Sequence, residues 1–173
     1  PNVKPQRKPE RHSPEINAIY SAINAAEMQG EDDHWIRTKH RPKGDISTAY
    51  GPLQLTKTLA RDYLERKSDM FSPDEQEYLD RFVDQGRKFM DYDRGRIKDK
   101  TYGYGGTGHL RGPEDAAMYE NVTKKMLSDI YKKNEGDLDR VWREWRFGHR
   151  QKGDDPRYQR KFLNVLANYS NGV

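Results

Sequence analysis

Six segments of the chain carry apolar residues at the three- and four-residue spacing of an amphipathic helix. They span residues 13–30, 55–67, 71–93, 113–134, 137–147 and 156–169. In the first segment, Ser13 and Pro14 are typical of a helix start, and Gly30 is typical of a helix end. The rest of the chain has no pattern of a parallel sheet and only a weak hairpin signal at residues 34–38. We therefore expect a mainly α fold with at most a small β-hairpin.

Two stretches fall outside the helical pattern. Residues 1–12 contain three Pro, several basic residues and no apolar stripe, which is typical of a disordered arm. Residues 93–112 form a Gly-rich connection, and connections of about twenty residues are usually functional or disordered. We expect residues 13–173 to fold as a single domain that contains this loop.

Glu27 is the one acidic residue that continues the apolar stripe of the first helix, because it follows Ile23 by four positions and Ile16 by eleven. A carboxyl group buried without full compensation keeps its proton to higher pH. Such an acid can protonate the leaving oxygen of a glycosidic bond. The alternative is that Glu27 ends the helix and turns toward solvent beside Gln29 and Gly30.

The order of the segments favours the catalytic interpretation. A helix that closes on Glu27, a polar interval, and STAYGPLQL at residues 47–55 before another helix resemble the lytic transglycosylase family. That family has a lysozyme-like fold and shows a helix-ending Glu followed downstream by Ser, two small residues and Gly-Leu-Met-Gln. Residues 136–150, GDLDRVWREWRFGHR, resemble its later Ala-Tyr-Asn-x-Gly segment, and residues 155–169 resemble its closing helix.

The resemblance implies a goose-type lysozyme or soluble lytic transglycosylase domain with Glu27 as its catalytic residue. Gln54 is then expected to face the acid and the substrate, with Ser47 nearby, while Gly51 lets backbone and ligand approach closely. The other substrate-binding candidates are Tyr50, Tyr102, Tyr104 and Trp145.

The chain departs from the family at two places near the acid. Met28 follows Glu27 where the family usually has Ser, and Trp145-Arg146 replaces the Tyr-Asn pair. The tyrosine hydroxyl that would bond the acid is therefore missing from that segment. Tyr50, Tyr102 and Tyr104 are the candidates to replace it.

The resemblance also implies a choice between two reactions. A lytic transglycosylase uses one Glu, first as acid and then as base toward the muramic 6-hydroxyl, and leaves 1,6-anhydromuramic ends. A hydrolytic muramidase uses a second carboxylate. Asp32, Asp33 and Asp45 lie in the interval from which that carboxylate could come.

Composition narrows the remaining options. Hydrophobic residues make up only 32% of the chain. Cys is absent, and its absence excludes disulfides, thiol nucleophiles and Cys-ligated zinc. The glycines of GYGGTG have the spacing of a dinucleotide-binding motif, but the strand and helix that such a binding site needs do not flank them. His34 and His40 match no metal-ligand spacing. We expect no metal and no cofactor.

Two other function classes stay open. One is a non-catalytic lysozyme-like module that binds glycan or protein. The other is a nucleic-acid-binding protein, suggested by the basic arm and the Tyr- and Gly-rich loop, but a net charge of only +4 argues against it. We expect peptidoglycan, and other virion proteins, as partners, with no nucleic acid and no membrane span.

The divergent motifs and the lack of an export signal are typical of a bacteriophage virion protein or endolysin. Such a protein would be carried in the virion or released into the host. It would act at the bacterial cell wall.

Overall fold

The computed structural model describes residues 10–171, which form a mainly α fold. Its helices are α1 (Pro14–Glu27), α2 (Lys57–Arg66), α3 (Pro73–Asp93), α4 (Pro113–Lys133), α5 (Leu138–Phe147) and α6 (Pro156–Asn171), with short 3-10 turns at Ser68–Met70 and Lys100–Tyr102. All six predicted helices are confirmed. Residues 1–9 of the expected disordered arm lie outside the described residues.

The predicted hairpin at residues 34–38 does not form. Within residues 10–171 the only β-type contacts are two isolated bridges, from Tyr50 to Arg37 and to Leu55. The backbone at residues 34–38 does not pair as strands. Its course is set by the contacts of the Arg37 side chain and by the turn at residues 50–55.

Local capping fixes where the helices begin. The Ser13 hydroxyl accepts the Ile16 amide at the start of α1, and Ser72 and Glu75 form a capping box at the start of α3. Helix α1 ends at Glu27, slightly earlier than expected, and Gly30 follows with a φ of +78°. This early end places Glu27 at the rim of the core.

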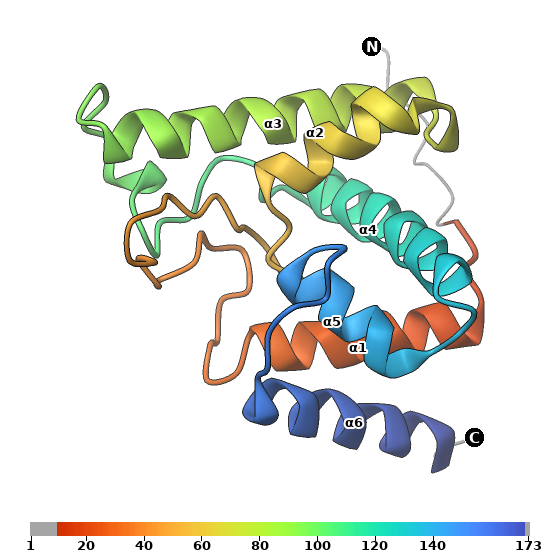
Figure 1. Ribbon diagram of the computed structural model, residues 1–173. Helices are drawn as coiled ribbons and strands as arrows, with labels where there is room; N and C mark the ends of the chain where they lie inside the picture. The colour runs from red at the N-terminus through yellow and green to blue at the C-terminus, as the bar shows by residue number, and fades with distance from the viewer. Residues whose placement is uncertain (1–9, 172–173) are drawn as a thin grey trace.

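Helix α4 is the central element, because it packs against α1, α3 and α5 (Figure 1). Helices α2 and α3 pair on one side of it, and α1 and α6 pair on the other. Its inward face is fully buried and includes Tyr119, Val122, Met126 and Leu127. Between residues 10 and 171, no helix is both long and apolar enough to cross a membrane.

The turn at residues 50–55 is fixed against α4. The Tyr119 hydroxyl accepts the backbone amides of Leu53 and Leu55 and donates to the Tyr50 carbonyl at 2.8 Å. Gly51 has a φ of +84°, and a Cβ there would come within 2.6 Å of the Tyr119 ring. Only glycine combines this backbone conformation with so close an approach.

Arg37 joins the two long loops that lie together at one end of the molecule (Figure 1). Its guanidinium is fully buried, pairs with both Asp93 oxygens and donates to the carbonyls of Ser47 and Tyr102. The group also lies 3.9 Å from the ring centroid of Tyr104. Because residues 38–40 follow directly, Arg37 also holds one wall of the cleft described next.

Candidate functional site

A cleft of about 280 Å³ opens where the C-terminal end of α1 meets the start of α6. Its walls come from α1 and the residues after it, from the loop at residues 36–40, from Gln54, from the last turn of α5 and from the start of α6. Segments far apart in the sequence therefore meet at this one place.

Glu27 is the buried acid of this cleft. Only 4% of its side chain is exposed, and its Oε1 accepts a hydrogen bond from Arg146 Nη1 at 3.1 Å. Burial raises the pKa of Glu27 from its ordinary 4.5 to about 7, although Arg146 and Tyr158 act to lower it and Asp155 acts to raise it further. Near neutral pH the carboxyl group therefore exchanges readily between its acid and base forms.

The sequence explains why Glu27 lies there. It shares the face of α1 that carries Ile16, Ile19 and Ile23, and this face packs against α4 and α6. As the last residue of α1, Glu27 reaches the edge of the core, where the cleft begins.

Two residues of the C-terminal region, Arg146 and Tyr158, lie next to the Glu27 carboxyl group. Arg146 bonds Glu27 and also lies 3.6 Å from Asp155, with its guanidinium over the ring of Tyr158. The Tyr158 hydroxyl is buried beside the Glu27 carboxyl group without the geometry of a regular hydrogen bond to any described residue. The tyrosine nearest the acid thus comes from α6 and is none of Tyr50, Tyr102 or Tyr104.

Gln54 lies in the same cleft as Glu27, as expected. It adopts a left-handed backbone conformation with a φ of +53°, and its Nε2 donates to the carbonyls of Ile36 and Gly51. These bonds fix the amide group at the cleft wall. Its oxygen has no partner among the described residues, so it can accept a hydrogen bond from a ligand.

Three other candidate site residues belong to the core. Tyr50 is fully buried and donates to the Thr107 carbonyl at 2.7 Å, and Trp145 is 8% exposed and donates to the Leu53 carbonyl at 2.9 Å. Gly51 is buried against Tyr119. The expectation that these three contact substrate is therefore replaced by a structural role.

The remaining candidates surround Arg37 rather than Glu27. Ser47 and Tyr102 accept hydrogen bonds from Arg37 through their carbonyls, and Tyr104 packs its ring on the guanidinium. The Tyr102 hydroxyl pairs with His109 Nδ1 at 3.0 Å. None of these residues lines the cleft, so Ser47, Tyr102 and Tyr104 do not lie where substrate-binding residues were expected.

The three expected second carboxylates also lie elsewhere. Asp32, Asp33 and Asp45 are exposed and do not line the cleft, and Asp33 pairs with Arg111 at 3.1 Å. Glu31 and Asp155 line it instead.

Both of these carboxylates have partners. Lys39 lies 2.7 Å from Glu31, and Asp155 accepts the Tyr158 amide at 3.0 Å. Tyr158 is a cleft residue that sequence reasoning missed. Its helical spacing with Phe162 and Val165 indicates burial, but it does not indicate that Glu27 is its neighbour.

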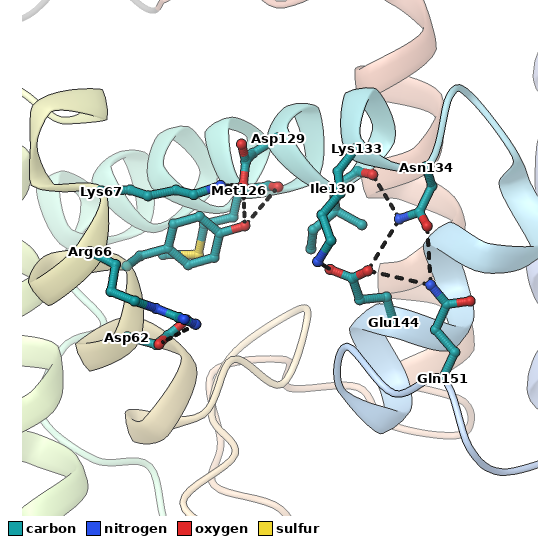
Figure 2. Close-up of polar contacts among 11 residues, drawn as sticks. Asp62, Arg66, Lys67, Met126, Asp129, Ile130, Lys133, Asn134, Glu144 and Gln151 are labelled. Atoms are coloured by element: carbon teal, nitrogen blue, oxygen red, sulfur yellow. Dashed lines mark hydrogen bonds and ion pairs between the residues drawn. The ribbon is translucent and has the colours of Figure 1, made fainter.

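A second, larger cavity of about 440 Å³ lies between α2, α4 and α5 (Figure 2). On one wall Asp129 accepts from the Tyr63 hydroxyl and pairs with Lys67 at 2.7 Å. On the other, Glu144 pairs with Lys133 at 2.9 Å and accepts from Asn134. Asp129 and Glu144 each accept hydrogen bonds from at least two side chains, whereas Arg146 is the one side chain in regular hydrogen-bond geometry with Glu27 among the described residues, so this cavity offers no acid comparable to Glu27.

No group of three or more His, Cys, Asp or Glu side chains between residues 10 and 171 is arranged to hold a metal ion. No family model matches the chain, and comparisons with curated proteins and with solved structures find no similar protein. The function is therefore argued from the cleft itself.

Proposed function

We propose that this chain is a lysozyme-like domain that cleaves the β-1,4 bond between N-acetylmuramic acid and N-acetylglucosamine in peptidoglycan. The observation that carries the proposal is the buried Glu27 carboxyl group in an open cleft, with its pKa raised to about 7 by burial. Glycosidic bond cleavage needs a carboxylic acid that is still protonated near neutral pH.

The arrangement of the segments supports the lysozyme-like assignment. The end of α1, the turn at residues 50–55, the last turn of α5 and the start of α6 resemble successive segments of the lytic transglycosylase family. Glu27, Gln54, Arg146 and Tyr158 bring one residue from each of these segments to a single cleft.

The proposed reaction is that of a lytic transglycosylase. Glu27 gives its proton to the glycosidic oxygen, the bond from this oxygen to muramic C1 breaks, and positive charge develops at C1. The Glu27 carboxylate then takes the proton of the muramic 6-hydroxyl, whose oxygen bonds to C1 and closes the 1,6-anhydro ring. Glu27 ends protonated as it began, and no water is consumed. A pKa of about 7 suits both halves of this cycle.

The anhydro-forming reaction is favoured over hydrolysis because both other carboxylates that line the cleft already have partners. Glu31 is paired with Lys39, and Asp155 caps α6 through the Tyr158 amide. In a hydrolytic muramidase, the alternative on the same fold, one of these two would have to release its partner to activate water.

A non-catalytic glycan-binding module is a second candidate function. The observation that favours it is the ion pair between Arg146 and Glu27, since Arg146 stands where the family has Asn and its charge stabilises the carboxylate over the protonated acid. In either case we propose bacterial peptidoglycan as the ligand. We also propose that the chain is a phage virion protein or an endolysin, with other virion proteins as partners.

The test is digestion of purified peptidoglycan by the wild-type protein and by Glu27→Gln, with the released fragments read by mass spectrometry. Glu120→Gln is the matched control, because Glu120 lies on the exposed part of α4, away from the cleft, and pairs with Lys124 at 2.9 Å. We expect 1,6-anhydromuramic fragments from the wild type and the control, and at least about a 100-fold loss in Glu27→Gln.

Other outcomes point elsewhere. Reducing muramic ends would identify a hydrolase, and Glu31→Gln and Asp155→Asn would then locate its second carboxylate. If the wild type released nothing while a control muramidase digested the same sample, the enzyme proposal would fail. Retained binding to peptidoglycan would then favour the binding module.

A further inference from the structure

Arg146 holds an unusual position for a residue next to a proton donor. Its Nη1 bonds Glu27 at 3.1 Å, its Nη2 lies 3.6 Å from Asp155, and 40% of its side chain is exposed. Arginine carries five N–H donors in a planar fork, so these two contacts leave further donors for a ligand, and Arg146 lines the cleft.

The pairing opposes catalysis in the empty cleft. A cation beside a carboxyl group stabilises the carboxylate, whereas Glu27 must hold its proton when the glycosidic bond breaks. Removal of Arg146 would leave Glu27 buried next to the negative Asp155, and both conditions favour the protonated acid. The structure therefore contains a cation whose departure would activate the acid.

We propose that Arg146 recognises a carboxylate on the substrate, and that it leaves Glu27 for this carboxylate when the substrate binds. The inference rests on the proposed function. Muramic acid carries its lactyl group at C3, and this group ends either in a free carboxylate or in a peptide with carboxylates of its own. Glu27 takes a proton from solvent as Arg146 moves, and it is then ready to protonate the glycosidic oxygen.

The charges around the cleft fit an anionic substrate. Lys39 and His40 line the side formed by the loop after α1, and Arg157 lines the side formed by α6. Arg157 is exposed and forms no ion pair with the described residues. Arg157 attracts a carboxylate to the rim of the cleft, and Arg146 is the cation of the cleft that contacts Glu27.

The groups that face Glu27 come from three places. Arg146 belongs to α5, Asp155 and Tyr158 belong to the start of α6, and Glu31 lies on the chain that leaves α1. Glu31 is neutralised by Lys39, and Asp155 stays in place because it caps α6. Arg146 is therefore the charged group that is free to exchange partners.

The experiment measures kcat/KM against pH on glycan strands and on the same strands after their carboxyl groups are converted to methylamides. We expect the wild type to prefer the charged strands by about 10-fold or more, the effect of one charge-assisted hydrogen bond. Arg146→Gln is expected to cleave both strands at similar rates. On the neutral strands, Arg146→Gln should also stay active to higher pH than the wild type. In this variant Glu27 keeps its proton even though no substrate carboxylate draws a cation away from it.

Two comparisons sharpen the test. Arg160→Gln removes an exposed arginine of α6 outside the cleft and should retain the wild-type preference, and Arg146→Lys should retain part of it. Strands with free lactyl groups and strands with peptides show which carboxylate Arg146 binds.

The proposal is wrong if the wild type cleaves charged and neutral strands equally, or if Arg146→Gln keeps the preference. Those results, with Glu27→Gln inactive, would still leave the proposed function in place. Failure of the wild type on every strand would overturn both.

Discussion

Two buried carboxylates of this molecule behave in opposite ways, although both are removed from solvent. Glu27, at the end of α1, is 4% exposed and has a pKa raised to about 7. Glu75, in the first turn of α3, is fully buried, and burial raises its pKa less than its hydrogen bonds to Lys125 and the Ser72 amide lower it, so its pKa falls below the ordinary 4.5.

The number of donors contributes to the difference. Glu75 accepts from Lys125 Nζ and the Ser72 amide at 2.7 Å each, and Asn121 adds a third bond. Glu27 accepts one hydrogen bond, from Arg146. The helix ends add to this contrast, because the N-terminal turn of α3 favours a negative charge and the C-terminal turn of α1 disfavours it. Burial with several donors therefore leaves the pKa of Glu75 lowered, whereas burial with few donors leaves the pKa of Glu27 raised.

The largest expected effect is a difference in how stability depends on pH. The pKa of Glu27 is about 7 in the folded protein against 4.5 for an ordinary glutamate, so folding favours the protonated form. The free energy of unfolding should be unaffected by Glu27 below pH 4.5 and should fall by about 3 kcal/mol between pH 4.5 and 7. Glu27→Gln should lack this loss and become the more stable protein at pH 8, as urea unfolding at several pH values can measure.

Glu75 supplies the opposite control. Its lowered pKa stabilises the fold above the ordinary value of 4.5, and this contribution should be lost as the pH falls below that value. Glu75→Gln should therefore be less stable than the wild type at pH 7 and approach it in acid. If both substitutions changed stability in the same direction with pH, the contrast between the two sites would be wrong.

A smaller effect is expected when each carboxylate loses its cation. Lys125→Met leaves the fully buried Glu75 with two donors and should lower the free energy of unfolding by roughly 1–3 kcal/mol at pH 7. Arg146→Met should change it by less than about 1 kcal/mol, because Arg146 is 40% exposed and Glu27 can take up a proton instead. Thermal or urea unfolding of the two variants tests this order, and a larger loss in Arg146→Met would contradict it.

The sequence predicted the features that depend on local pattern. The start of the first helix followed from Ser13 and Pro14, and the register of Glu27 with Ile16 and Ile23 indicated burial, with an exposed helix end as the alternative. These signals lie within a few residues of one another, so they can be read along a single chain.

The surroundings of the acid could not be predicted in the same way. Arg146 is 119 positions from Glu27, and Tyr119, which buries the turn at Tyr50, is 69 positions away from it. Whether a tyrosine beside a turn enters the core or faces a ligand depends on such distant partners. The aromatic residues expected to bind sugar were therefore the ones most often misplaced.

The smallest expected effect concerns Tyr158. Its buried hydroxyl has no regular hydrogen-bond partner among the described residues, yet its position beside Glu27 lowers the pKa of that carboxyl group. Tyr158→Phe should raise this pKa by less than about one unit and move the alkaline limit of kcat/KM to higher pH by the same amount. Stability should change little, because the substitution removes a buried hydroxyl without breaking a regular hydrogen bond. Tyr169→Phe, on the exposed part of α6, is the matched control and should leave the pH profile unchanged. A shift to lower pH in Tyr158→Phe would mean that the hydroxyl stabilises the protonated acid, and the contrast between a donor-poor Glu27 and a donor-rich Glu75 would then need a different explanation.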